Sequence, residues 1–177
     1  CQDSSKLIIS DLQCEYLDAP LAIDNTTPHF GWKMTCGQKG TSSSAYQLLV
    51  ASELDKLNEE EADLWNSGKV SSDTSIGIAY GGKALTSRTQ AYWKVRVWNQ
   101  ADVPSEWSKP SSFGIGMLSE NDWSAEARFI GVEQADEEIQ SAPWLRTSVV
   151  YEPGKGKALL SVSSLGYHEA YINGRPV

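Results

Sequence analysis

The chain has 177 residues, of which 40% are apolar, including seven Trp and seven Tyr. This is enough for one domain of about 100 to 150 residues and part of another. Its 23 acidic and 15 basic residues give a net charge of −8, and the basic residues are scattered, so no nucleic-acid-binding surface is expected. No stretch approaches the ~18 consecutive apolar residues of a membrane-spanning helix.

The first residue is Cys1, and residues 1–6 are mostly polar. This start resembles that of a mature bacterial lipoprotein, in which the N-terminal cysteine carries lipid. It predicts a tether over 1–6 and a protein lipid-anchored through Cys1 in the bacterial periplasm or on the outer-membrane surface; the alternative is an unmodified cysteine at a chain boundary. Cys14 and Cys36 could form a disulfide in an oxidising compartment or lie apart as small apolar groups. Three cysteines without histidine spacing do not make a metal site.

The segment from residue 7 to about 117 is typical of a β-sandwich, because short apolar runs alternate with polar turns and helical periodicity is nearly absent. One short helix is expected over 52–62, since the Ser52 hydroxyl can accept hydrogen bonds from the amides of a first turn. The predicted strands are 7–12, 29–34, 45–51, 65–70, 75–80, 90–98 and 111–115.

The clearest strand is 90–98, in which side chains alternate between two faces. One face, predicted to be core, carries Trp93, Val95 and Val97; the other carries Tyr92, Lys94, Arg96 and Trp98. Trp107 follows the next turn, and we expect its indole to lie over the Arg96 guanidinium or the Lys94 stem, a contact worth about 0.5 to 2 kcal/mol. We interpret Arg96 and Trp107 as a structural clasp rather than a ligand site.

A second unit begins after residue 118 and resembles a sandwich that is not completed. Strands are predicted at 144–151 and 157–163. Asn173-Gly174 predicts a two-residue hairpin turn, because both central positions of such a turn need a positive φ. Three residues follow this turn, so we expect the sheet to find further partners in sequence beyond Val177 or in another chain.

A series of short motifs runs along nearly the whole chain. The motifs of the first domain are Pro28-His29-Phe30-Gly31-Trp32, Ala45-Tyr46-Gln47-Leu48-Leu49-Val50-Ala51, Asp63-Leu64-Trp65-Asn66-Ser67-Gly68-Lys69-Val70, Tyr92-Trp93-Lys94-Val95-Arg96-Val97-Trp98 and Trp107-Ser108. Those of the second are Asp122-Trp123-Ser124-Ala125, Pro143-Trp144-Leu145-Arg146 and Leu165-Gly166-Tyr167-His168-Glu169-Ala170-Tyr171-Ile172-Asn173-Gly174. The order and spacing of these motifs resemble the N-terminal region of large bacterial α-L-rhamnosidases of a Bacteroides-like type.

The resemblance implies an all-β chain in three parts: the tether at 1–6, a fibronectin type III or immunoglobulin-like β-sandwich at 7–118, and the incomplete N-terminal sandwich of the rhamnosidase type at 119–177. It implies a non-catalytic accessory region of an inverting glycoside hydrolase that removes terminal L-rhamnose in an (α/α)6 barrel farther along the protein. The partners implied are the downstream domains and, through the parent enzyme, rhamnose-containing glycans.

No residue of the chain is assigned a catalytic role, and no cofactor is expected. Inverting hydrolysis needs two carboxyl groups roughly 6.5 to 9.5 Å apart, and the sequence identifies no such pair. The motifs of zinc proteases, serine hydrolases, phosphate-binding loops and dinucleotide-binding folds are missing from the sequence. Gly114-Ile115-Gly116 is interpreted as a turn, and His29 and His168 as structural histidines.

Two alternatives remain open from the sequence. The chain could be a surface carbohydrate-binding or adhesion module in which exposed aromatic residues such as Trp98, Trp123 or Tyr167 stack on sugar rings, although no binding residue is assigned. It could also be the N-terminal part of a different glycosidase, because the sandwiches that open β-galactosidase-type enzymes carry an Asn-Gly hairpin as well.

Overall fold

The computed structural model describes residues 6–131, 144–150, 152 and 158–177. The chain divides into two units, Cys1–Ala127 and Arg128–Val177, and each is described by itself. The described regular structure is β-strand apart from a 3-10 turn at Glu120–Asp122. The tether and the domain boundary after residue 118 stay predictions.

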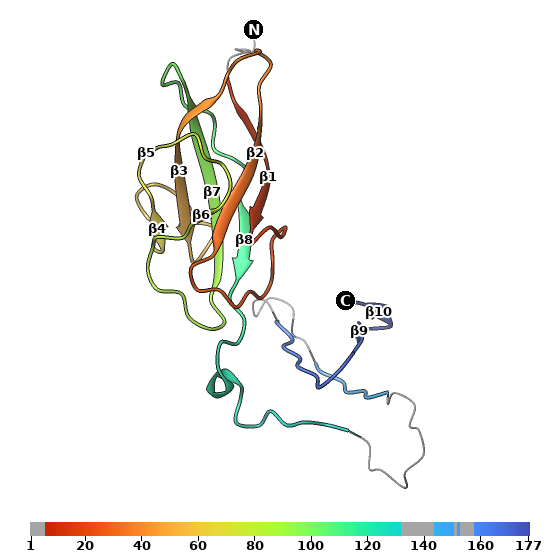
Figure 1. Cartoon of the computed structure of the whole chain (residues 1–177). Coiled ribbons are helices and arrows are strands. Elements are labelled where there is room, and N and C mark those ends of the chain that lie inside the picture. Colours follow the sequence, from red (N-terminus) through yellow and green to blue (C-terminus); the bar gives the residue numbers. More distant parts are fainter. Residues whose placement is uncertain (1–5, 132–143, 151, 153–157) are drawn as a thin grey trace. The chain divides into compact units, whose positions relative to one another are not determined.

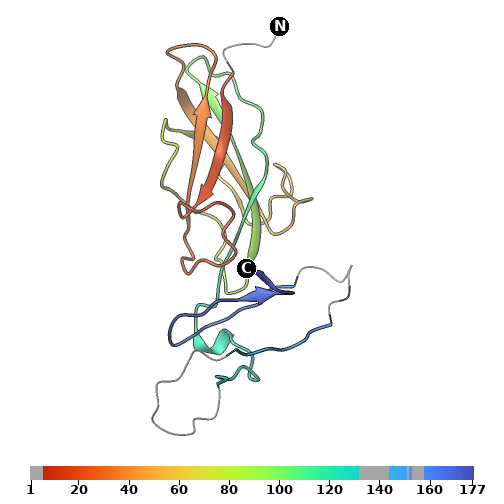
Figure 2. The same cartoon turned by 90° about the vertical axis from the view of Figure 1, so that its right-hand side faces the viewer.

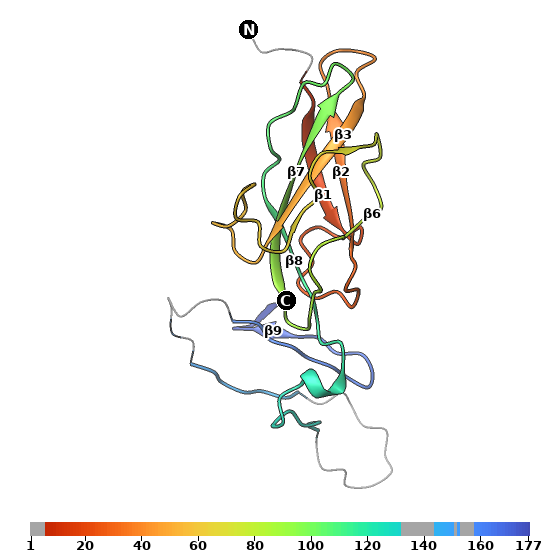
Figure 3. The same ribbon diagram turned by 90° about the vertical axis from the view of Figure 1, so that its left-hand side faces the viewer.

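Two antiparallel sheets form the first unit and pack face to face (Figures 1, 2 and 3). The first has the order β1-β2-β6, formed by Ile8–Cys14, His29–Thr35 and Ile78–Ala79. The second has the order β4-β3-β7-β8, formed by Trp65–Asn66, Ser43–Ala51, Gln90–Asn99 and Ser111–Gly114, with β5 (Val70–Ser71) also paired to β3. The prediction of an all-β sandwich is confirmed.

Aromatic side chains fill the space between the sheets. Phe30 of β2 reaches across to the other sheet, where its ring centroid lies 4.6 Å from that of Trp93 and 5.6 Å from that of Phe113. Aromatic pairs of this kind contribute about 0.5 to 1.5 kcal/mol beyond the burial of their area. Trp93, Val95 and Val97 are buried on this inner face, as the alternation of β7 predicts.

The predicted helix over 52–62 is wrong. Side chains accept from several amides of this segment, and the helical bond from the Ala62 amide to the Asn58 carbonyl is not continued into a helix. The Ser52 amide and hydroxyl both donate to the Asp63 carboxylate, at 2.8 and 2.7 Å. Asn58 Oδ1 accepts from the amides of Glu60 and Glu61. Such local bonds compete with helix formation. The segment forms turns over the outer face of the second sheet, where Leu57 packs on Leu49 and Ala51.

Cys14 carries a free thiol, and no disulfide joins it to Cys36. Cys14 lies opposite Phe30 in the β1–β2 ladder, whereas Cys36 follows Thr35, which lies opposite Ile8 at the other end of the ladder. Six residues of strand separate two such positions by about 20 Å, and a disulfide needs Cα atoms within about 7 Å. Burial raises the pKa of the Cys14 thiol to about 12, so the thiolate is strongly disfavoured.

The second unit contains one described hairpin, formed by β9 (Tyr171–Ile172) and β10 (Arg175–Pro176). Its turn residues Asn173 and Gly174 have φ values of 51° and 78°, as the Asn-Gly signal predicts. The predicted strands at 144–151 and 157–163 are wrong over their described parts, 144–150 and 158–163. A strand needs a hydrogen-bonded neighbour, and the described residues supply none to these segments.

Candidate functional site

The outward face of β7 brings the predicted clasp residues together. Arg96 Cζ lies 4.6 Å from the Trp107 ring centroid and 4.9 Å from that of Trp98. Lys94 Nζ lies 5.0 Å from the Trp107 centroid, and Lys69 Nζ 4.9 Å from the Trp98 centroid. These five side chains form a cation–aromatic row in the order Lys69, Trp98, Arg96, Trp107, Lys94.

The Arg96 guanidinium of this row is engaged within the protein. Arg96 Nε and Nη2 donate to Gln47 Oε1 at 3.1 and 2.8 Å, and Nη2 also donates to Glu59 Oε1 at 2.7 Å. Burial lowers the pKa of Lys94. The geometry is that of a clasp between the sheet and the segments that cover it, while the energetic role of the contact stays a prediction.

The aromatic residues considered as sugar platforms have unequal access to solvent. Trp98 is 8% exposed beneath Lys69 and Arg96, so its face is not open to a ligand. Trp123 is half-buried after the 3-10 turn. Tyr167, in the second unit, is 90% exposed, and its hydroxyl donates to Glu169 Oε1 at 2.8 Å.

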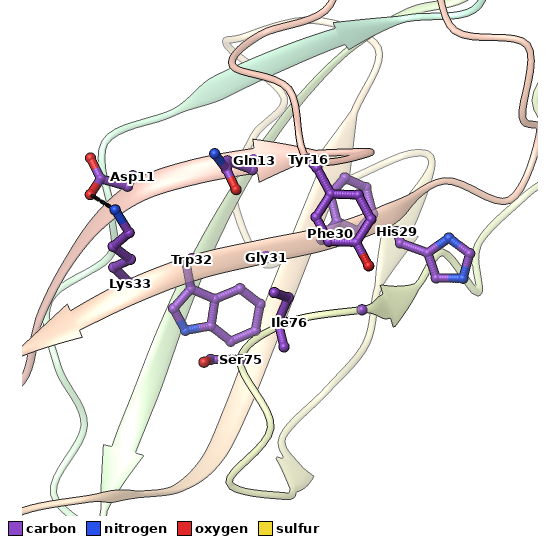
Figure 4. Close-up of a pocket in the computed structure, with 11 residues that line it drawn as sticks. Asp11, Gln13, Tyr16, His29, Phe30, Gly31, Trp32, Lys33, Ser75 and Ile76 are labelled. Carbon is purple, nitrogen blue, oxygen red and sulfur yellow. Dashed lines mark ion pairs between the residues drawn. The ribbon is translucent and has the colours of Figure 1, made fainter.

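A hollow of about 100 Å³ lies at an outward-facing part of β1 and β2, where the sequence analysis assigned no site (Figure 4). Phe30 and Trp32 belong to the core, so Gly31 between them lies on the other face, opposite Gln13 of β1. Figure 4 shows Gly31 at the centre, with Gln13 on one side and Ile76 on the other. Tyr16 and His29 stand at one end, and Asp11 and Lys33 at the other, joined by an ion pair of 3.1 Å.

Tyr16 reaches the hollow from a tight turn. Cys14 and Leu17 exchange two backbone hydrogen bonds of 3.0 Å, and the central residues Glu15 and Tyr16 have φ values of 51° and 62°. A β-bulge between Ser10 and Gln13 accompanies a positive φ of 49° at Asp11. The turn has no sequence signal, because Glu and Tyr are not the residues that such turns favour.

The Glu15 carboxylate ties this turn to β2. Its Oε1 accepts from the His29 amide at 2.7 Å and from Asn25 Nδ2 at 3.0 Å, and lies 3.0 Å from His29 Nδ1. Burial alone would raise the pKa of Glu15, but the hydrogen bonds from His29 and Asn25 outweigh it and hold this pKa below its usual range. The other histidine, His168, has Nδ1 2.7 Å from the Ser164 hydroxyl.

Within 6–131, 144–150, 152 and 158–177, no group of three or more His, Cys, Asp or Glu residues could hold a metal ion. No helix of this part of the chain is long and apolar enough to cross a membrane. Cys1, for which lipidation is predicted, lies outside the described residues.

Known proteins resemble this chain along its length. Residues 9–119 match the family model described as "Rha78A-like, N-terminal immunoglobulin domain". An α-L-rhamnosidase from Formosa agariphila is 35% identical over 201 residues, covering 100% of this chain and 21% of that protein. One from Streptomyces avermitilis is 40% identical over 121 residues, covering 68% of this chain and 12% of that protein.

Solved structures agree with these matches. The crystal structure of the Streptomyces avermitilis α-L-rhamnosidase complexed with L-rhamnose superposes with a TM-score of 0.64 at 39% identity, over 67% of this chain and 11% of that one. The α-L-rhamnosidase from Dictyoglumus thermophilum gives a TM-score of 0.63 at 36% identity, over 68% and 14%. The sandwich is thus of the immunoglobulin-like class, and the chain belongs to the family of Rha78A-like N-terminal immunoglobulin domains. It spans 12% to 21% of the length of these two curated relatives.

Proposed function

We propose that this chain is a non-catalytic N-terminal accessory region of an inverting glycoside hydrolase that removes terminal α-L-rhamnose from glycans or glycosides. The observation that carries the proposal is the match of the entire chain to a fifth of an α-L-rhamnosidase, together with the family model over 9–119. The relatives reported above are all α-L-rhamnosidases, which favours this class over a different glycosidase. The Bacteroides-like subtype stays a prediction.

Four described carboxyl groups differ from the general acid of a glycosidase. The general acid of a glycosidase needs a raised pKa so that it is protonated when the leaving oxygen departs. The described carboxyl groups with a resolved shift all have a lowered pKa, because each accepts hydrogen bonds that stabilise its charged form. These groups are Glu15, Asp63, Asp122 and Glu169.

Release of L-rhamnose tests this proposal. We would assay the 177-residue chain and a longer protein that contains it on a chromogenic α-L-rhamnopyranoside. The longer protein should release rhamnose with inversion at the anomeric carbon, followed by NMR, whereas the 177-residue chain should release none. Hydrolysis by the short chain, or no hydrolysis of any rhamnoside by the longer protein, would contradict the proposal.

The partners proposed for the chain are further domains of the same protein, through which it would meet rhamnose-containing glycans. Pairing between chains is the second possibility for the second unit, since β9 and β10 are two residues each and leave open edges. Size-exclusion chromatography with light scattering distinguishes the two: a dimer of the 177-residue chain supports pairing between copies, and a monomer contradicts it.

We also propose that Cys1 carries lipid and anchors the protein in the bacterial envelope. The support is the cysteine at position 1 followed by a polar segment. Expression of the precursor in a bacterium, followed by membrane fractionation and mass spectrometry, tests this. The native protein should sediment with membranes and carry acyl chains at Cys1, and Cys1→Ser should release it; an unmodified native protein in the soluble fraction would contradict the anchor.

A further inference from the structure

We propose that the hollow at β1 and β2 binds one neutral pyranose unit of a glycan, stacked on Tyr16 and Ile76 over the Gly31 floor. This goes beyond the accessory role above, because it assigns the first sandwich a ligand of its own. It holds for any neutral pyranose and is independent of whether the whole protein releases rhamnose.

The size of the hollow limits the ligand to a single ring. Pockets that enclose drug-sized molecules measure roughly 300 to 1,000 Å³, and this hollow has about 100 Å³. A ligand here therefore inserts one small group and keeps most of its surface in water. The terminal unit of a glycan chain fits that description, because the remainder of the chain can extend into solvent.

The walls provide an apolar surface for one face of a sugar ring. Tyr16 is 67% exposed and Ile76 is 60% exposed, and both line the hollow (Figure 4). A pyranose has a face of C–H groups, which packs favourably on an aromatic ring and an aliphatic side chain. Gly31 makes room for this contact, because a Cβ at this position would meet Ile76 Cγ1 at 3.5 Å.

The remaining lining groups suit hydroxyl groups and disfavour a net charge. The Gln13 amide can both donate and accept hydrogen bonds, as a sugar hydroxyl does. At one end Asp11 and Lys33 form an ion pair, and at the other His29 Nδ1 lies 3.0 Å from Glu15 Oε1. A charged ligand would compete with the Asp11–Lys33 ion pair, whereas a neutral polyol can add hydrogen bonds to the remaining sites of these groups.

The position of Tyr16 is maintained against local strain. The left-handed region is unfavourable for a non-glycine residue, and here Glu15 and Tyr16 adopt it in succession. The two Cys14–Leu17 hydrogen bonds and the bonds from Glu15 to His29 and Asn25 hold the turn in place. Strain of this kind is typical of functional positions, and a turn fixed before binding loses less entropy when the ligand arrives.

Titration by two-dimensional NMR tests the proposal on the full 177-residue chain, with methyl α-L-rhamnopyranoside and methyl β-D-glucopyranoside as probes. We expect saturable shifts centred on the amides of Gln13, Gly31 and Ile76, with a Kd in the millimolar range for at least one probe. Tyr16→Gly should weaken this binding by about fivefold or more, since the stacking surface is lost. Gly31→Ala should weaken it to a similar extent by filling the floor.

Both variants should fold, which keeps the test decisive. Glycine relieves the strain at position 16, and the methyl group at position 31 makes an ordinary contact and needs no positive φ. Tyr167→Gly, which removes an exposed tyrosine of the second unit, is the matched control and should bind as the native chain does. The proposal is overturned if neither glycoside gives a saturable shift up to about 100 mM, or if Tyr16→Gly and Gly31→Ala bind as well as the native chain.

Discussion

Ser108 and Val95 exchange two hydrogen bonds: the Val95 amide donates to the Ser108 hydroxyl at 3.1 Å, and the Ser108 amide donates to the Val95 carbonyl at 2.8 Å. Ser105 and Val97 do the same, at 3.1 and 2.7 Å. β8 pairs with residues 90–93 of β7. The segment that carries the two serines therefore continues this side of the sheet, with hydroxyl groups in the place of strand carbonyls.

Ser108→Ala should lower the free energy of unfolding by about 1 to 3 kcal/mol, because the buried Val95 amide loses its acceptor. Urea unfolding followed by tryptophan fluorescence measures the change. Ser72→Ala is the control, since the Ser72 hydroxyl accepts an exposed amide hydrogen bond from Thr74 and its loss should cost less than about 0.5 kcal/mol. Equal costs for the two variants would contradict the role given to Ser108.

The clasp predicts an energetic coupling between Arg96 and Trp107. A double-mutant cycle with Arg96→Met and Trp107→Leu should give a coupling energy of about 0.5 to 2 kcal/mol in urea unfolding. The same cycle with Lys33→Met in place of the arginine variant should give a value near zero, because Lys33 lies on β2 in the other sheet. A coupling energy near zero in both cycles would contradict a stabilising contact between Arg96 and Trp107.

Asp122 connects the segment after β8 to the loop before β7. Its Oδ2 accepts from the Ser87 hydroxyl at 2.6 Å and from the amides of Leu118 and Ser119 at 3.1 and 2.8 Å. The bond from Ser87, followed by that from the Ser119 amide, holds the pKa of Asp122 below its usual range. Its carboxylate therefore favours the folded arrangement above pH ~4, the ordinary aspartate pKa.

This contribution should disappear as the pH falls through the lowered pKa of Asp122, because protonation removes the charge that the three donors stabilise. The Ser119 amide resonance, followed by NMR from pH 6 down to about pH 2, should shift with a midpoint below the ordinary aspartate value. Asp122→Asn should abolish that transition. A midpoint at or above the ordinary value would show that the hydrogen bonds do not favour the charged form.

The chain packs closely at Gly114, the last residue of β8. Its amide donates to the Pro20 carbonyl and its carbonyl accepts from the Ile23 amide, so the segment 20–23 crosses directly over it. A Cβ at Gly114 would clash with the Leu21 carbonyl oxygen and the Gln90 side chain. Gly114→Ala should therefore lower the free energy of unfolding by about 3 kcal/mol.

Gly131→Ala is the matched control, because a Cβ at Gly131 meets no atom within 4 Å. Thermal unfolding should separate the two variants, with Gly131→Ala close to the native chain. A native-like midpoint for Gly114→Ala would mean that segment 20–23 moves away at little cost. The turn predicted at Gly114-Ile115-Gly116 is wrong, because Gly114 ends β8 and Ile115 continues the extended chain in a parallel bridge with Ile23. The motif serves close backbone approach.

The strands that bury one face could be predicted from the sequence. In β7 the alternation of Trp93, Val95 and Val97 with polar and aromatic residues indicates both the strand and its core face, and the structure confirms both. The hairpin at Asn173-Gly174 was predictable because its turn needs positive φ values, which these two residues adopt readily.

Other features depend on contacts between distant residues. The segment 52–62 looks helical locally, yet the Asp63 side chain binds Ser52 and turns the chain. The hollow combines Tyr16, Gly31 and Ile76 from three separate segments, and no linear motif connects them. The segments 144–151 and 157–163 contain the apolar residues typical of strands. A strand, however, forms only where a second strand pairs with it through hydrogen bonds.

The outer positions of both sheets are occupied by very short or interrupted strands. In the first sheet β6 has two residues and β1 is broken by a bulge; in the second, β4 and β5 have two residues each and β8 has four. A foreign strand needs a long, flat row of free amides and carbonyls to add to a sheet. The first sandwich offers none along its described borders, so self-templated fibre growth from this domain is disfavoured.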